Sequence, residues 1–268
     1  MNTLPDPDSL RVLLLDADGS LFPSEAPAFD ASAEVTNRFL AALGIEATYT
    51  PEHLLATTTG KNFRTTAVDL AIAHGVAVES APGSFDGTGG PTLTSAMLDD
   101  WVAEEKKVVS AHLGRVLRPD PAVLEPLHRL ARRSRLAAVS SSALSRLEVC
   151  FRATGLAELI PAESRYSAED SLPVPTSKPD PAVYLHALDQ LNVRAGQTIA
   201  IEDSLPGARS AVAAGIATVG NLTFVPAEER AQRGEDLHGA GVLALVESWG
   251  DMAAMVLESA PVGAERRS

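Results

Sequence analysis

The sequence predicts an α/β fold: a doubly wound parallel-sheet, Rossmann-like core that carries a small inserted all-helical domain. Three observations support this fold class. The apolar run of residues 12–15 ends abruptly in acids and a glycine, which is typical of a buried strand of a parallel sheet. Helix and strand patterns alternate from Arg118 onward. Between Phe29 and Arg118 we find helical patterns and no strand pattern, which predicts a helical insertion.

The inserted segment is predicted to be helical because its apolar residues recur at the spacing of helical turns. Residues 22–28 carry two prolines and are expected to form a linker before it. Residues 80–91 are rich in Gly, Ser and Pro and are expected to form a loop within it. The expected helices are residues 29–43, 51–56, 63–74 and 93–113.

In the α/β part, short apolar runs followed by polar residues predict strands, and longer periodic segments predict helices. The expected strands are residues 12–15, 135–139, 159–162, 198–201, 216–219 and 242–246. The expected helices are residues 121–132, 144–154, 178–191, 207–214, 226–233 and 249–257. We therefore assign residues 1–24 and 116–268 to an α/β catalytic core and residues 25–115 to the helical domain.

Composition limits the classes of function. The chain of 268 residues is 45% hydrophobic and 21% charged, as is usual for a globular protein. Its formal net charge of −13 argues against a nucleic-acid-binding protein, which needs a basic surface. No apolar run approaches the roughly 20 residues of a membrane span, and residues 1–10 do not resemble a signal peptide. We therefore expect a cytoplasmic monomer or small homo-oligomer with no nucleic-acid or membrane partner.

The single cysteine, Cys150, excludes an intrachain disulfide and a cysteine-based metal site. Its neighbours Val149 and Phe151 are apolar and lie in a predicted helix. We expect Cys150 to occupy a core position rather than to serve as a reactive thiol.

Two acids follow the first predicted strand. Residues two apart in extended backbone face the same side, so the carboxylates of Asp16 and Asp18 are expected to point the same way. Gly19 then lets the chain turn without a steric penalty. A nucleophile beside a proton donor explains this pair, and an aspartate-rich turn is the alternative.

Other polar groups follow later predicted strands. Glu202 and Asp203 are adjacent acids at a strand end, and carboxylate oxygens suit Mg²⁺. Ser140, Ser141 and Ser142 lie between a strand and a helix, where hydroxyls and helix-terminal N–H groups bind anions; an N-cap cluster is the alternative. These groups are expected to meet at one edge of the sheet, because the carboxyl ends of parallel strands share that edge.

The negative charges expected at this edge of the sheet indicate that a cation binds there. At about 4 Å and an effective dielectric constant of about 20, each pair of like charges costs on the order of 4 kcal/mol. A divalent cation together with the lone lysine Lys178 offsets most of that repulsion among the acids. The same cation lets a carboxylate nucleophile approach a phosphate.

These residues resemble the motifs of the haloacid dehalogenase superfamily, in its phosphatase and beta-phosphoglucomutase-like branch. The resemblance extends from Arg11 to about Val246, and all four motifs occur in order. The matching segments are Asp16-Ala17-Asp18-Gly19-Ser20-Leu21, the serines of residues 140–142, Lys178-Pro179-Asp180-Pro181, and Glu202-Asp203-Ser204-Leu205-Pro206-Gly207. Two departures are Ser20, which replaces a usual Thr or Val, and Pro23, which replaces a frequent Asp.

The resemblance implies a role for each matching residue. Asp16 corresponds to the nucleophile that forms an aspartyl phosphate, and Asp18 to the general acid/base. Ser141 corresponds to the phosphate ligand, with Ser142 as a second candidate and Ser140 left open. Lys178 corresponds to the lysine that neutralises nucleophile and phosphate. The implied Mg²⁺ ligands are Asp16, the backbone carbonyl of Asp18, Glu202 and Asp203.

The inserted segment resembles the cap domain of this branch. In such caps a glycine followed by a basic residue reaches the substrate, and Gly60-Lys61 is the best match, with Arg64 one turn further on. The alternative interpretation is a helix N-terminus with solvated cations.

We therefore expect a Mg²⁺-dependent phosphatase that hydrolyses a small phosphorylated metabolite, such as a sugar phosphate, through an aspartyl phosphate. A beta-phosphoglucomutase-like phosphomutase is the nearest alternative. A dehalogenase is less consistent, because that branch needs no acid at the position of Asp18. A catalytically idle phosphate-binding module is a further alternative, although none of the motif acids or the lysine is lost.

Overall fold

The computed structural model describes residues 3–6, 8–58, 62–79 and 92–258. The chain divides into two compact units, one comprising the residues up to Pro23 together with those from Leu117 onward, and the other Ser24–Val116. We call these the α/β unit and the inserted unit. The assignment of catalysis to the first and of a cap role to the second stays a prediction.

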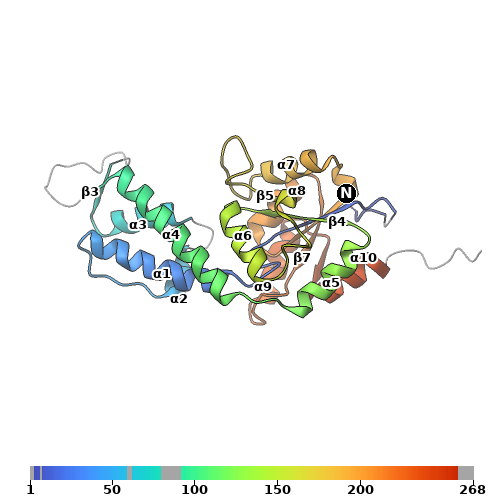
Figure 1. The fold of residues 1–268 in the computed structure, drawn as a ribbon, viewed down its shortest axis with the longest axis horizontal. Helices are drawn as coiled ribbons and strands as arrows, with labels where there is room; N and C mark the ends of the chain where they lie inside the picture. The colour runs from blue at the N-terminus through green and yellow to red at the C-terminus, as the bar shows by residue number, and fades with distance from the viewer. Residues whose placement is uncertain (1–2, 7, 59–61, 80–91, 259–268) are drawn as a thin grey trace, which may run out of the picture. The chain divides into compact units, whose positions relative to one another are not determined.

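The α/β unit is built on a six-stranded parallel sheet, which confirms the predicted fold class (Figure 1). The strand order is β5-β4-β1-β6-β7-β8. The strands are β1 (Val12–Leu15), β4 (Arg135–Ser140), β5 (Arg165–Ser167), β6 (Thr198–Glu202), β7 (Ala217–Asn221) and β8 (Ala244–Val246). Strand β1 lies between β4 and β6, where the order of the strands reverses along the chain, and open α/β sheets bind ligands at such points.

Helices cover both faces of this sheet. They are α5 (Pro121–Ala131), α6 (Leu144–Ala153), α7 (Ala182–Leu191), α8 (Leu205–Ala213), α9 (Arg230–Gly239) and α10 (Trp249–Glu258), with 3₁₀ turns η1 (Ala162–Ser164) and η2 (Ala195–Gln197). Val12 and Leu14 pack with residues of α7 and α8 on one face. Leu13 and Leu15 point to the other face and are also fully buried, so β1 is a central strand. No helix among the described residues is long and apolar enough to cross a membrane.

The register of the sheet brings the predicted motifs together. Asp16 follows β1 directly, Ser140 is the last residue of β4, and Glu202 is the last residue of β6. Leu15 pairs with Ala138 on one side and Ile201 on the other, so these three strand ends lie at the same edge. The backbone N–H of Asp16 donates to the Ile201 carbonyl at 2.9 Å and extends the ladder to the site itself.

The inserted unit contains four helices, α1 (Glu25–Ala42), α2 (Pro51–Thr58), α3 (Phe63–Ala73) and α4 (Ser95–Val116). Its core is formed by Phe39, Leu40 and their apolar neighbours, and the rings of Phe39 and Trp101 meet edge to face with centroids 5.9 Å apart. The expectation of an all-helical domain is corrected by a short parallel pair, β2 (Ala77–Val78) with β3 (Thr92–Leu93). Strands of two residues are too short to show an alternating pattern.

Some predicted boundaries were wrong. Residues 159–162 do not form a strand; the edge strand β5 begins at Arg165, and its buried residues carry polar side chains that hide the apolar signal. Helix α1 begins at Glu25 inside the expected linker, since Pro27 lies in its first turn, where a proline loses no hydrogen bond. Helix α9 begins at Arg230 rather than at residue 226. The expected loop of residues 80–91 lies outside the described residues.

Candidate active site

The site begins at the turn that follows β1. Asp16 is buried, and Gly19 turns the chain with a φ of +81°, a conformation that other residues rarely adopt. A Cβ atom on Gly19 would also clash with the carboxylate of Asp203. Ser20, which stands where the motif usually has Thr or Val, is fully buried. Its hydroxyl accepts a hydrogen bond from Asn221 Nδ2 at 3.1 Å. The turn therefore needs glycine where the motif has it.

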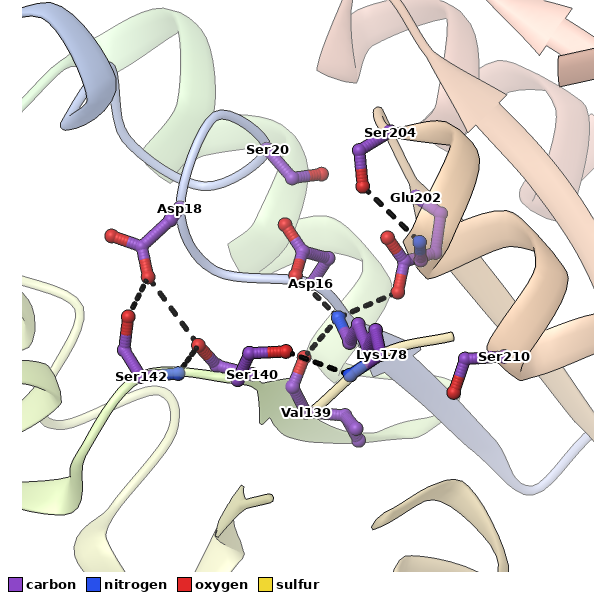
Figure 2. Close-up of polar contacts among 12 residues, drawn as sticks. Asp16, Asp18, Ser20, Val139, Ser140, Ser142, Lys178, Glu202, Ser204 and Ser210 are labelled. Atoms are coloured by element: carbon purple, nitrogen blue, oxygen red, sulfur yellow. Dashed lines mark hydrogen bonds and ion pairs between the residues drawn. The ribbon is translucent and has the colours of Figure 1, made fainter. Parts of the chain in front are cut away.

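Lys178 is the central cation of the site (Figure 2). Its Nζ donates to Asp16 Oδ1 at 2.5 Å, to Glu202 Oε1 at 2.6 Å and to the Val139 carbonyl at 2.9 Å. All three side chains of these ion pairs are at most 9% exposed. One ammonium group thus joins the ends of β1, β4 and β6, although 162 residues separate it from Asp16.

Burial controls the protonation of these groups. Burial raises the pKa of Asp16 above its ordinary value, despite the lowering effect of Lys178. Burial likewise raises the pKa of Glu202 to about 7, with the negative charge of Asp16 adding to the effect. Burial alone would lower the pKa of Lys178, but the carboxylates of Asp16 and Glu202 raise it above its ordinary value. The lysine therefore stays charged, while the carboxylates lack sufficient positive charge around them.

Glu202 is fixed by Tyr184, which lies outside the sequence motifs, and by the glycine that ends its own motif. The hydroxyl of Tyr184, a buried residue of α7, donates to Glu202 Oε1, the oxygen that also accepts from Lys178. The Lys178 ammonium lies 5.4 Å from the centroid of the Tyr184 ring. On the other side, a Cβ atom on Gly207 would overlap the Glu202 carboxylate, so this position of α8 requires glycine.

The carboxylates of Asp16, Glu202 and Asp203 fit a divalent metal ion. One oxygen from each lies within 4.8 Å of the others, and all three residues are buried. Asp16 Oδ2 and Glu202 Oε2 are buried without a hydrogen-bond partner among the described residues, which is costly unless a cation is bound. The Lys178 ammonium pairs with Asp16 and Glu202, and a divalent ion with oxygen ligands, as Mg²⁺ prefers, would balance the remaining negative charge.

Asp18 lies apart from the lysine and accepts hydrogen bonds from serine hydroxyls (Figure 2). An arginine also holds it. Ser142 Oγ donates to Asp18 Oδ2 at 2.7 Å, and Ser140 Oγ lies 3.3 Å from the same oxygen. Arg146 Nη2 donates to Asp18 Oδ1 at 3.1 Å. Ser141 is directed differently, because its Oγ accepts from the backbone N–H of Lys178 at 3.1 Å. The structure thus brings all three serines to the site, with Ser141 on the Lys178 side.

The predicted cap residues are only partly described. Gly60 and Lys61 lie outside the described residues. Arg64 lies in the first turn of α3 and forms an ion pair with Asp99 of α4, within the inserted unit. Asn62 caps α3 by accepting from the N–H of Thr65 at 2.9 Å. A substrate role for Gly60, Lys61 and Arg64 stays a prediction.

A family model of haloacid dehalogenase-like hydrolases matches residues 10–215, which span β1 to the end of α8 and include every motif of the site. The chain belongs to this family. It is therefore an enzyme of the hydrolase class, and the predicted resemblance is confirmed.

Individual relatives agree with this assignment. The Protein CbbY, plasmid, of Cupriavidus necator is 38% identical over 89 residues, which is 33% of this chain and 32% of that protein. A structure of a candidate beta-phosphoglucomutase from Thermotoga maritima is 25% identical, with a TM-score of 0.63 over 93% of this chain and 99% of that one. A CbbY structure from Rhodobacter sphaeroides in complex with xylulose-(1,5)bisphosphate is 22% identical, with a TM-score of 0.62 over 90% and 96% of the chains, and shows the fold alone.

Proposed function

We propose that this hydrolase is a Mg²⁺-dependent phosphatase that acts on a small phosphorylated metabolite through a covalent phosphate on Asp16. The observation that carries the proposal is the buried Lys178 ammonium, which bonds Asp16 Oδ1. A buried carboxylate held by a cation that offsets its charge suits a nucleophile for a phosphate dianion.

In the first step, an oxygen of Asp16 attacks the phosphorus atom of the substrate and the bond from phosphorus to the leaving oxygen breaks. Asp18, the second acid of the turn, donates a proton to that leaving oxygen, so the product departs as a neutral alcohol. Lys178 offsets negative charge on Asp16 and on the incoming phosphate throughout.

In the second step, a water molecule attacks the phosphorus atom of the aspartyl phosphate. Asp18, now ionised, accepts the proton of this water, and the bond from Asp16 to phosphorus breaks. Free phosphate leaves and both aspartates return to their starting states. Ser141 and Ser142 are the proposed phosphate ligands, and the Ser141 hydroxyl already accepts from the N–H of Lys178.

The proposed ligands of Mg²⁺ are Asp16, the carbonyl of Asp18, Glu202 and Asp203. When bound, the ion offsets the repulsion between carboxylates and phosphate dianion and helps to align them. Tyr184 and Lys178 keep Glu202 in its present orientation through bonds to the same oxygen, Oε1.

We propose sugar phosphates as the substrate class, a choice supported by the likeness to the candidate beta-phosphoglucomutase. The same likeness makes a phosphomutase the second candidate, in which the phosphate on Asp16 passes to another hydroxyl rather than to water. Gly60, Lys61 and Arg64 are the proposed contacts with the rest of the substrate.

One experiment separates these functions. A panel of phosphorylated metabolites, including hexose 1-phosphates with a trace of the bisphosphate, is incubated with enzyme and Mg²⁺, and both free phosphate and isomer are measured. The proposal expects phosphate release with little isomer, abolished by a chelator. Conversion of the 1-phosphate to the 6-phosphate without free phosphate would establish the mutase, and no turnover of any compound would support an idle phosphate-binding module.

A further inference from the structure

We infer that Arg146 is a positioning residue for proton transfer, because it holds the carboxylate of Asp18 in a fixed orientation beside Asp16. The inference rests on the proposed function, since it concerns the acid/base step of the same site. Arg146 lies outside all four sequence motifs, and its role follows from its contact with Asp18 alone.

The carboxylate of Asp18 is held at both oxygens. Arg146 Nη2 donates to Oδ1 at 3.1 Å. Ser142 Oγ donates to Oδ2 at 2.7 Å (Figure 2). Donors on both oxygens oppose rotation of the carboxylate about its Cβ–Cγ bond. Loss of Arg146 removes this donor from Oδ1 while the hydroxyl contacts on Oδ2 stay, so rotation of the carboxylate is less restrained. An acid/base group that rotates freely spends less time within reach of the proton it must transfer.

Helix α6 provides a rigid support for Arg146. The N–H of Leu144, at the start of the helix, donates to Asp170 Oδ2 at 2.7 Å. The buried face of the helix is formed by Leu147, Cys150 and Phe151, all fully buried in the core. Arg146 lies in the first turn of this anchored helix, so the base of its side chain has little freedom to move.

The pair lies at the edge of the site and is partly shielded from water. The side chains of Arg146 and Asp18 are 26% and 19% exposed, so water offsets part of the ion-pair energy. Loss of this contact is expected to lower turnover in a protein that still folds. Arg152, on the same helix, is the matched control: its side chain is 78% exposed and pairs with Glu148 at 2.7 Å.

The test compares Arg146→Met, Arg146→Lys and Arg152→Met on p-nitrophenyl phosphate, whose leaving group departs without a proton. With this substrate only the second step needs Asp18. Loss of Arg146 is therefore expected to slow hydrolysis of the phosphoenzyme but not its formation. Arg146→Met is expected to lower kcat by about tenfold and KM in parallel, so that kcat/KM hardly changes, and to show a burst of p-nitrophenolate in the first turnover. Arg146→Lys or added guanidinium restores part of kcat, and Arg152→Met behaves as wild type.

Three results would overturn the inference. An unchanged kcat would remove the role, a raised KM at constant kcat would make Arg146 a substrate ligand, and an equal loss in Arg152→Met would indicate a general effect on the helix. A crystal structure of Arg146→Met that keeps the Asp18 carboxylate in its present orientation would also overturn it, whatever the activity. Failure of the proposed function itself is recognised separately, because the wild-type enzyme would then release no p-nitrophenolate.

Discussion

Replacing Lys178 with Met tests how the buried charges of the site are balanced. The substitution keeps most of the apolar side chain and removes three hydrogen bonds, to Asp16, to Glu202 and to the Val139 carbonyl. Two carboxylates then remain buried without the cation that joined them. Removing one partner of a buried ion pair costs roughly 3–5 kcal/mol of the free energy of unfolding, and we expect that loss at about pH 8 in a chelating buffer.

The loss is expected to shrink as the pH falls. Burial raises the pKa of Glu202 from 4.5 in the ordinary case to about 7, and removal of Lys178 raises it further. Between the unfolded and folded pKa values, the folded protein holds a proton that the unfolded chain has released, so the free energy of unfolding decreases as pH rises. The loss in the free energy of unfolding is therefore greatest above the pKa that Glu202 has in the folded protein. It shrinks as pH falls toward the pKa that Glu202 has in the unfolded chain.

The assay is urea unfolding followed by the fluorescence of Trp249, which is buried in the α/β unit, in a Trp101→Phe background. The free energies of Lys178→Met and of the exposed control Lys107→Met are compared at about pH 8 and about pH 5. A loss of less than about 1 kcal/mol at the higher pH, or a loss that grows at the lower pH, would refute the proposed charge balance.

Three further outcomes follow from the same geometry. Gly207→Ala pushes a Cβ atom into the Glu202 carboxylate and is expected to raise the Mg²⁺ concentration for half-maximal activity by about tenfold, whereas Gly196→Ala, where a Cβ meets no atom within 4 Å, leaves it unchanged. Burial raises the pKa of the Cys150 thiol to about 12, so a disulfide reagent should modify it only as fast as the protein unfolds; rapid reaction of native protein would contradict this. Activity should vanish with a chelator and return with Mg²⁺ but poorly with Ca²⁺, whose looser coordination misaligns the reactants; full activity after chelation would rule out a metal role for Asp203.

The sequence was most informative where chemistry and strand position coincide. The acids that follow β1 and β6, and the serines that follow β4, occur at strand ends that are recognisable from short apolar runs. Parallel strands place such ends at one edge of a sheet, so the meeting of Asp16, Ser140 and Glu202 was predictable. The contact of Lys178 with Asp16 was implied only by the family resemblance, because no strand or periodic pattern places a loop lysine.

The sequence was least informative where a contact depends on side-chain direction. Arg146 and Tyr184 both lie in predicted helices, where an arginine and a tyrosine have ordinary structural roles. Only the packing of α6 and α7 shows that they reach Asp18 and Glu202. The sequence also did not distinguish the roles of the three serines. In the structure, the turn after β4 directs Ser141 toward Lys178 and Ser142 toward Asp18.

The central claim is a covalent phosphate on Asp16, and trapping that intermediate tests it most directly. Wild-type enzyme is mixed with Mg²⁺ and p-nitrophenyl phosphate, quenched in acid within the first turnover, digested, and analysed by mass spectrometry, with Asp16→Asn as the control. We predict a phosphorylated peptide that contains Asp16 in the wild type and neither phosphopeptide nor turnover in a folded Asp16→Asn protein. Hydrolysis by Asp16→Asn at a substantial rate, or phosphate trapped on a different residue, would contradict the account.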